Sequence, residues 1–69
     1  MTELAVVLGQ NIRKVRKGRG LSQEKLALMC GVDRSYMGRI ERGEVNITVL
    51  KLYDIAKVLN VNLVNLLPK

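Results

Sequence analysis

The sequence predicts an all-α fold in which five short helices form one compact domain over residues 1–69. Three observations predict this fold. Apolar residues recur at three- and four-residue spacing along most of the chain. A capping residue or a glycine marks each break between these segments. No linker, internal repeat or low-complexity segment divides the chain, so a single domain is expected.

The first helix is expected over about residues 3–17. Its core-facing stripe consists of apolar residues at intervals of four, four and three, namely Leu4, Leu8, Ile12 and Val15. The Gly-Arg-Gly segment at residues 18–20 ends this helix.

A second helix is expected over about residues 23–30. Ser22 is a good N-cap. Lys25 stands where a capping box would place Glu, so only the Ser22 half of a capping box is expected. Ala27 permits a neighbouring helix to approach closely, and Gly31 permits the positive φ that ends a helix abruptly.

The third helix is expected over about residues 34–42, with Gly43 as its stop. Asp33 is expected to cap it by accepting from the free backbone N–H groups of the first turn. Apolar residues fall where the second and third helices must touch, namely Leu26, Cys30, Val32, Met37 and Ile40. Two short helices joined by a tight turn over residues 23–42 are the pattern of a helix-turn-helix, which offers its second helix to the DNA major groove.

The rest of the chain predicts a fourth helix and a short fifth one. Thr48 caps the fourth helix, which ends near Asn60. The side chains expected to face apolar neighbours are Leu50, Ile55, Val58 and Leu59, with Leu52 and Tyr53 on adjoining faces. The last helix is expected over residues 63–67, capped by Asn62 and stopped by Pro68.

The charge balance narrows the choice of partner. The chain carries 12 Lys and Arg against 6 Asp and Glu, a net charge of +6, which favours a polyanion such as nucleic acid or a membrane surface. A membrane partner is not expected, because the apolar face of the first helix is already claimed by the core. Five basic residues lie close together, namely Arg13, Lys14, Arg16, Lys17 and Arg19. This cluster taken alone fits phosphate attraction and an ordinary solvated face equally well.

Other function classes are excluded by what the sequence lacks. It has no histidine and one cysteine, so neither an internal disulfide nor a zinc site is expected, and Cys30 is expected to be a small core residue. No nucleophile–base set or Gly-rich phosphate loop is present, so no enzyme activity, cofactor or small-molecule ligand is expected. No transmembrane run or signal peptide is found, which predicts a cytoplasmic, nucleoid-associated protein.

Four motifs resemble those of a known family, at residues 21–27 (Leu-Ser-Gln-Glu-Lys-Leu-Ala), 31–33 (Gly-Val-Asp), 40–43 (Ile-Glu-Arg-Gly) and 59–61 (Leu-Asn-Val). Through them the chain resembles the Cro/C1-type (XRE-like) helix-turn-helix family of phage repressors, bacterial regulators and restriction-modification controller proteins. The resemblance runs from Ile12 to Leu67 and implies a lambda-repressor-like DNA-binding domain. Residues 32–37, followed by residues 40–43 and 46–48, look most like the controller proteins, with Ser35 in place of their Thr and Met37 in place of their Ile.

The resemblance implies a sequence-specific, dimeric regulator of transcription that binds a palindromic operator in the major groove. A controller protein of a restriction-modification system, acting as activator and repressor on adjacent operators, is the favoured interpretation. Activation would add RNA polymerase as a partner. A Cro-like phage repressor and an antitoxin that represses its own operon are alternatives, and so is a protein-interaction module that keeps the fold without binding DNA.

Four residues of the third helix are expected to contact DNA bases, namely Arg34, Ser35, Tyr36 and Arg39. An arginine fork can bond guanine O6 and N7 and contribute about 1–3 kcal/mol of discrimination. Each of these predictions has an alternative. The arginines could serve only to keep the surface soluble, and Ser35 could have no function. The DNA contact of Tyr36 is implied by the resemblance, and its alternative is partial burial. Gly38 permits close approach to DNA or close packing against the first helix, and the sequence leaves both open.

Phosphate contacts are expected from Gln23, Arg42, Asn46 and Thr48. Gln23 heads the second helix, whose N-terminal N–H groups attract a phosphate. The resemblance gives Gln23 a phosphate bond and a second role, bracing the third helix. The other three residues flank the far end of the third helix, and their alternative roles are a solvated charge, a turn residue and a helix cap.

Two further sets of residues are structural. The resemblance implies a partly buried ion pair between Arg16 and Glu41, which would join the first and third helices. The last helix has more large apolar residues than it can bury alone. Some of them are expected to form a homodimer patch with the fourth helix, namely Tyr53, Leu63, Val64 and Leu67.

Overall fold

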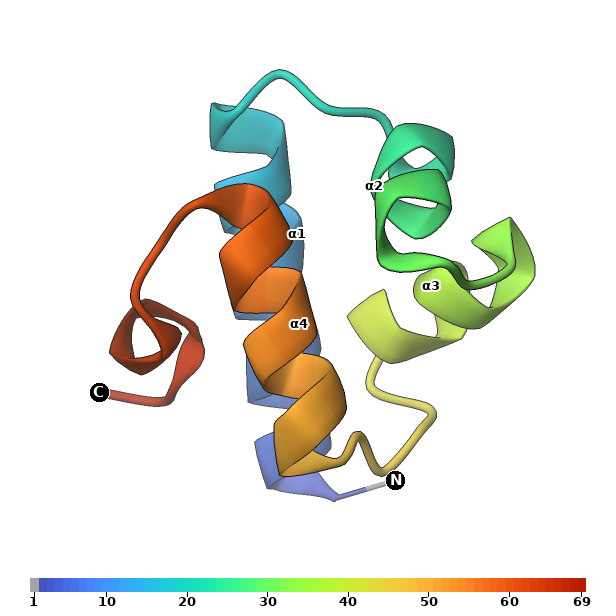
Figure 1. Cartoon of the computed structure of the whole chain (residues 1–69). Coiled ribbons are helices and arrows are strands. Elements are labelled where there is room, and N and C mark those ends of the chain that lie inside the picture. The colour runs from blue at the N-terminus through green and yellow to red at the C-terminus, as the bar shows by residue number, and fades with distance from the viewer. Residues whose placement is uncertain (1) are drawn as a thin grey trace.

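A computed structural model describes residues 2–69, which fold into four α-helices and one terminal 3-10 turn (Figure 1). The elements are α1 (Glu3–Gly18), α2 (Gln23–Cys30), α3 (Arg34–Glu41), α4 (Val49–Leu59) and η1 (Leu63–Leu66). The fold class is therefore all-helical, as the sequence predicts, and the helix-turn-helix is formed by α2 and α3.

The fifth α-helix expected from the sequence is instead the single 3-10 turn η1. Its bonds span three residues, from Asn65 N to Asn62 O and from Leu67 N to Val64 O. Proline disfavours the α region for the residue before it, and Leu67 before Pro68 is accordingly extended with ψ 156°. The expected cap is also absent, because the Asn62 side chain makes no cap hydrogen bond.

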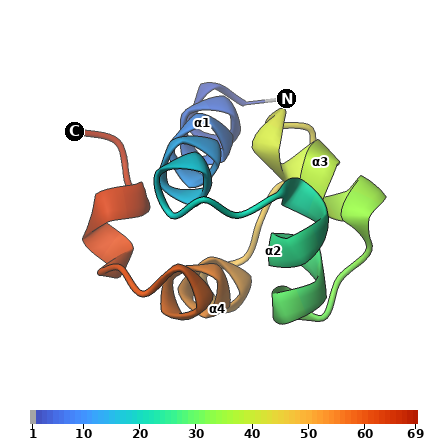
Figure 2. The ribbon, with the colours of Figure 1, turned by 90° about the horizontal axis from the view of Figure 1, so that it is seen from above.

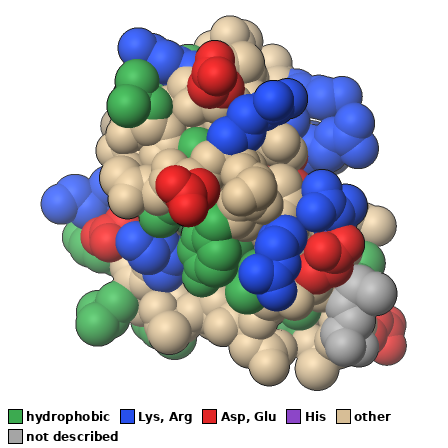
Figure 3. Space-filling view, turned by 90° about the vertical axis from the view of Figure 1, so that its right-hand side faces the viewer, with side chains coloured by type: hydrophobic (Ala, Val, Ile, Leu, Met, Phe, Trp, Pro, Cys, Tyr) green, Lys and Arg blue, Asp and Glu red, His purple; other side chains and the backbone are tan. Residues whose placement is uncertain are grey.

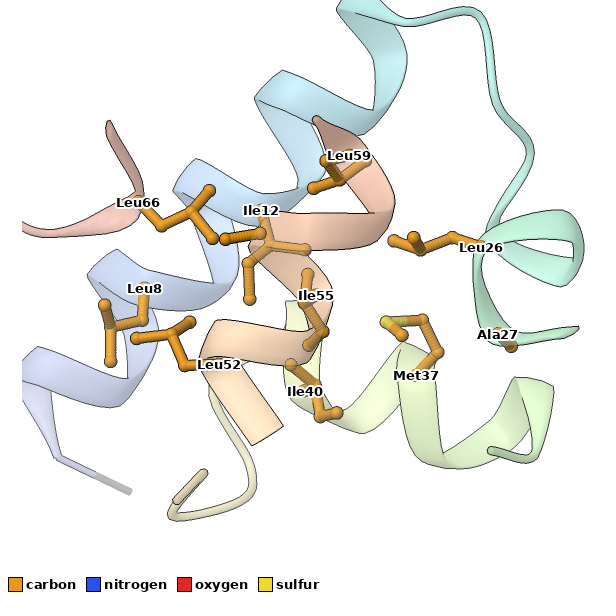
Figure 4. Close-up of a cluster of buried hydrophobic side chains, with 11 residues drawn as sticks. Leu8, Ile12, Leu26, Ala27, Met37, Ile40, Leu52, Ile55, Leu59 and Leu66 are labelled. Atoms are coloured by element: carbon orange, nitrogen blue, oxygen red, sulfur yellow. The ribbon is translucent and has the colours of Figure 1, made fainter. Parts of the chain in front are cut away.

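The helices enclose one hydrophobic core. Seen from above, α1 and α4 lie on either side of the core, with α2 and α3 at one end and η1 at the other (Figure 2). α3 packs on α1 and α2, while η1 contacts both α1 and α4. Fully buried side chains from all five elements meet in the centre (Figure 4), namely Ile12, Leu26, Met37, Ile55, Leu59 and Leu66.

The core-facing stripe of α1 differs from the prediction at its first residue, while Leu8, Ile12 and the half-buried Val15 face the core as predicted. Leu4 is 55% exposed, whereas Ala5, Leu8 and Ile12 are buried. The stripe continues into Arg16, which is buried although it is charged. Arg16 is buried because of its ion pair, so a search for apolar residues alone does not find its place in the stripe. The prediction that Leu4 lies in the core was wrong.

α4 differs from the prediction in a similar way. Leu50 is 78% exposed, whereas Leu52 is buried in the core. Ile55 and Leu59 face the core as predicted, and Val58 is half-buried against it. Apolar residues lie on most sides of this helix, so their spacing does not fix its orientation, and Leu50 is left on the outer face.

Side-chain caps set where most of the helices begin. Ser22 Oγ and Thr48 Oγ1 each accept from the backbone N–H three residues later, at 2.9 and 3.1 Å, as predicted. Thr2 caps α1 in the same way at 3.0 Å, which the sequence pattern did not indicate. Asp33 has the extended N-cap conformation, but its side chain makes no cap hydrogen bond, so that prediction was wrong. Its position is exposed, where water can solvate the carboxylate.

Two glycines let α1 pack directly on the C-terminal end of α3. A Cβ on Gly9 would lie 2.6 Å from the carbonyl oxygen of Glu41 and closer still to that of Ile40. Gly43, with φ +75°, follows α3, and a Cβ there would lie 2.6 Å from Val6 Cα. Backbone meets backbone at both points, so the end of α3 is held in one position against α1.

Candidate nucleic-acid interface

α3 presents a polar face because its apolar residues are used in the core. Met37 and Ile40 are buried, which turns Arg34, Ser35 and Arg39 outward into solvent. α2 and α3 occupy the right-hand side of Figure 1, and Figure 3 views the molecule from that side. Lys and Arg side chains are spread over this face, with acidic side chains between them.

An open groove crosses this face between α3 and the beginning of α2. It is lined by Gln23, Arg34, Ser35, Gly38, Arg39 and Arg42. Three of these residues were predicted to contact bases and two to contact phosphates. No acidic residue is among the six, so the groove suits a polyanion.

Gly38 forms the floor of this groove. A Cβ at this position would lie 3.1 Å from Arg42 Nη1 and 3.3 Å from Gln23 Oε1. The glycine therefore makes room for these two polar side chains and not for α1. Close packing of Gly38 against the first helix was one of the two alternatives, and it is wrong. The glycine that packs α1 against α3 is Gly9.

Beneath the groove, Arg16 and Glu41 form the ion pair that the resemblance implies. Arg16 Nε donates to Glu41 Oε2 at 2.7 Å and Nη2 donates to Oε1 at 3.0 Å, with both side chains buried. The third guanidinium nitrogen, Nη1, donates to the carbonyl oxygen of Leu21 at 2.9 Å. One side chain of α1 therefore holds both the C-terminal turn of α3 and the loop that leads into α2.

Gln23 connects this buried pair to the groove. Its Nε2 donates to Glu41 Oε1 at 3.1 Å, the oxygen that Arg16 Nη2 also reaches. The beginning of α2 is thereby bonded to the end of α3, which is the bracing role implied by the resemblance. The second hydrogen of Nε2 stays available to another acceptor.

Arg42 follows α3 and makes an exposed ion pair with Glu44. Arg42 Nε lies 2.8 Å from Glu44 Oε2, and Nη2 lies 3.4 Å from Oε1. The hydrogen bond from Arg42 lowers the pKa of the Glu44 carboxyl below its usual value, and the same bond raises the pKa of Arg42. Both groups are therefore charged at neutral pH.

The basic cluster of α1 does not form a single patch. Arg16 is buried, Lys14 lines a depression beside Pro68, and Arg19 Nη2 donates to Asn60 O at 3.0 Å. Arg13 and the buried Arg16 line a second groove next to the first one, together with Gln23, Glu41 and Arg42, and Arg13 is the exposed member of the cluster there. Sequence reasoning gave Arg13 no individual role, because the charge cluster alone does not show which member turns toward α3.

A helix-turn-helix family profile matches residues 12–66, a span that contains α2, α3, the groove and the buried ion pair. The chain belongs to this helix-turn-helix family. The match also covers every motif on which the resemblance to Cro/C1-type proteins rests.

Restriction-modification controller proteins are prominent among its relatives. Control protein C.SmaI from Serratia marcescens is 39% identical over 67 residues, which span 97% of this chain and 80% of that protein. Control protein C.BamHI from Bacillus amyloliquefaciens is 37% identical over 59 residues, 84% of this chain and 73% of that protein. The crystal structure of the restriction-modification controller protein C.AhdI from Aeromonas hydrophila matches with a TM-score of 0.85 at 40% identity, covering 90% of this chain and 94% of that one. Within the helix-turn-helix family, the chain is thus close to these proteins.

Three residues predicted to contact DNA lie outside the α3 groove of this helix-turn-helix protein. Tyr36 is half-buried against the core. Asn46 is exposed and lines a depression next to Thr2 at the start of α1. Thr48 is exposed and caps α4 with its hydroxyl, so its oxygen already has one partner.

The predicted dimer patch is partly exposed. Tyr53, Val64 and Leu67 are exposed, whereas Leu63 is half-buried and packs against the core. Tyr53 and Leu63 line one groove between α4 and η1, and Lys57 Nζ lies 5.7 Å from the centre of the Tyr53 ring. The structure thus places these residues on α4 and η1, away from the α3 groove.

None of the helices formed by residues 2–69 is long and apolar enough to cross a membrane. In the same part of the chain, no group of His, Cys, Asp and Glu residues is arranged to hold a metal ion. Cys30 is half-buried and packs against the core, as predicted, and its burial raises the pKa of the thiol.

Proposed function

We propose that this helix-turn-helix protein regulates transcription by binding double-stranded DNA sequence-specifically as a homodimer. The observation that carries the proposal is the groove on α3, where three arginines surround a glycine floor. The missing Cβ leaves room for Arg42 and Gln23 to lie in this groove, and arginine forks fit both base edges and phosphates. The net charge of +6 adds a sequence-independent attraction.

In this proposal Arg34 and Arg39 read base edges in the major groove, and Ser35 bonds a base edge or a phosphate. Arg34 is the first residue of α3. The N-terminal residues of a recognition helix are those that contact base edges in helix-turn-helix complexes. Tyr36 is half-buried, so its contact is limited to the exposed part of its ring and hydroxyl, facing the DNA backbone or a deformable base step.

Phosphate contacts flank this base-reading face. Gln23 and Arg42 lie next to each other over Gly38 and border the groove, where both can bond the DNA backbone. Arg13 joins them through the adjacent groove, which it shares with both residues. Asn46 and Thr48, in the loop before α4, are assigned to the next stretch of the same backbone.

Dimerisation is assigned to α4 and η1. Their exposed apolar side chains, Tyr53, Val64 and Leu67, have no role in the core, and Leu63 borders the same groove as Tyr53. Leu50, exposed one turn before Tyr53, extends this surface. A symmetric dimer of this kind would place two α3 helices about 34 Å apart, one turn of DNA, which requires a palindromic site.

A controller protein of a restriction-modification system is the role we favour, because C.SmaI, C.BamHI and C.AhdI are all described as control or controller proteins. In that role it would activate and repress adjacent operators, with RNA polymerase as a partner during activation. A Cro-like phage repressor and an antitoxin that represses its own operon are the alternative roles. Genomic neighbours distinguish the three roles, since they would be restriction and methyltransferase genes, a prophage, or a toxin gene.

Selection of binding sites from random DNA duplexes at a stated salt concentration tests the proposal. We expect a palindromic motif to be enriched by the wild-type protein. Arg34→Ala should abolish enrichment of the motif, whereas Lys14→Ala, which removes one positive charge on the side facing Pro68, should retain it. If the wild-type protein enriches no motif, the proposed function is wrong.

A further inference from the structure

An acidic side chain is held at the edge of the proposed DNA-binding surface. Glu44 is bonded to Arg42 through two nitrogen–oxygen contacts, of 2.8 and 3.4 Å. Arg42 lines both the groove on α3 and the adjacent groove that contains Arg13. The carboxylate of Glu44 is therefore tied to a guanidinium that belongs to both cationic grooves.

The position of Arg42 is well suited to an exchange of partners. Its Nη1 lies 3.1 Å from where a Cβ on Gly38 would be, so the guanidinium lies over the groove floor. Both side chains of the pair are exposed, so water can solvate either one and another anion can replace Glu44 at little cost. Glu44 is two residues from Arg42 and needs no change in the fold to release it.

We infer that Glu44 competes with DNA phosphates for Arg42 and thereby limits the protein's affinity for DNA. The inference rests on the proposed DNA-binding function and assigns a role to a residue outside the predicted contacts. In the free protein, Glu44 neutralises Arg42. When DNA binds, a phosphate oxygen replaces the carboxylate on the guanidinium, and Glu44 stays nearby as an uncompensated negative charge.

Competition of this kind has a distinct signature. The contact between Arg42 and a phosphate does not depend on the base sequence, so Glu44 should weaken specific and non-specific binding by the same factor. It should also flatten the salt dependence, because a cation that is already paired releases fewer counterions from DNA. The low pKa of the Glu44 carboxyl, caused by Arg42 and to a smaller extent by Arg39, keeps the competitor ionised at neutral pH.

The test is a double-mutant cycle on Arg42 and Glu44, with fluorescence anisotropy on the selected operator and on a scrambled duplex. Glu44→Gln should tighten binding to both duplexes by roughly fivefold, the scale of an exposed charge pair. The slope of log K against log salt should steepen by up to about 0.9 per bound protomer. In an Arg42→Gln background, Glu44→Gln should have no effect beyond that of the control.

The matched control is Asp54→Asn, which makes the same change in net charge at an exposed position of α4. If Glu44→Gln tightens binding no more than Asp54→Asn, or equally with and without Arg42, the competition is absent and only net charge acts. Weaker binding by Glu44→Gln would mean that Glu44 orients Arg42 for DNA, and would also overturn the inference. A wild-type protein that binds no DNA contradicts the proposed function itself, which is a separate outcome.

Discussion

Two ion pairs of this protein have almost the same length but very different surroundings. Arg16 and Glu41 meet at 2.7 Å with side chains 9% and 3% exposed. Arg42 and Glu44 meet at 2.8 Å with side chains 59% and 42% exposed. The first pair joins residues 25 positions apart in different helices, and the second joins residues two positions apart. Their nitrogen–oxygen distances therefore say little about what each pair does.

Burial determines how differently the two ion pairs respond to the loss of a partner. In the buried pair, little water reaches either group, so removal of one group leaves the other as a poorly solvated charge. In the exposed pair, water can solvate either group and a phosphate can replace the Glu44 carboxylate. Both pairs adjoin the same groove, because Glu41 bonds Gln23 and Arg42 lies over Gly38. The buried pair thus fixes the shape of this surface, and the exposed pair affects only its charge.

The largest expected effect comes from breaking the buried pair. Glu41→Ala should lower the free energy of unfolding by about 3–5 kcal/mol, because Arg16 is left charged and buried without its partner. Gln23 also loses its acceptor on α3. Urea unfolding followed by circular dichroism measures this loss.

A double substitution sharpens the interpretation of that loss. Replacing the pair by apolar residues, Arg16→Met with Glu41→Leu, should recover most of the lost stability, because no uncompensated charge remains. If Glu41→Ala alone unfolds at the same urea concentration as wild type, the pair does not hold α1 to α3 and the comparison fails.

The next effect concerns the backbone contact beside the buried pair. Gly9→Ala places a Cβ against the carbonyl groups of Ile40 and Glu41, and should cost about 1–3 kcal/mol as α1 and α3 are pushed apart. Gly18→Ala in the same helix is the matched control, because a Cβ there meets nothing within 4 Å. It should be neutral or stabilising by up to about 1 kcal/mol. Equal melting temperatures for the two variants would show that the contact at Gly9 is not tight.

On the exposed side, substitutions should change DNA binding and leave stability unchanged. Arg34→Lys keeps the charge but loses the planar fork, so discrimination between operator and scrambled DNA should fall by about 1–3 kcal/mol. Lys14→Arg is the control, since it makes the reverse change on α1, in the depression beside Pro68 and outside the α3 groove. Competitive binding measures the ratio of the two affinities. An unchanged ratio for Arg34→Lys would exclude base reading by this residue.

The sequence predicts where the helices of this fold begin better than which side of each helix is buried. Ser22 and Thr48 cap their helices as expected, because an N-cap depends on a few neighbouring residues, and α3 begins where predicted although Asp33 makes no cap hydrogen bond. Leu4 and Leu50 were placed in the core although they are exposed. Which apolar face is buried depends on the partner helices, and those lie far away in the sequence.

In the candidate site, too, some residues could be predicted from the sequence and others could not. The groove residues of α3 follow from helical spacing once the buried residues are known, and the pair of Arg16 with Glu41 follows from the family resemblance. Arg13 and Glu44 could not be singled out. Their roles depend on which way a long exposed side chain turns, and neither charge clusters nor periodicity contain that information.

The smallest expected effect is that of the exposed pair on stability. At neutral pH, Glu44→Gln should leave the melting temperature close to that of wild type, because an exposed pair is easily replaced by water. Arg42 lowers the pKa of Glu44 in the folded protein. The stabilisation by this pair is therefore fully present above the unfolded-state pKa of about 4.3, and it is lost as the pH falls through the lower pKa of the folded state. The difference between wild type and variant should therefore shrink toward zero in acid, as thermal melts over a pH series would show. A large difference at neutral pH, comparable to that of Glu41→Ala, would mean that burial is not what distinguishes the two pairs.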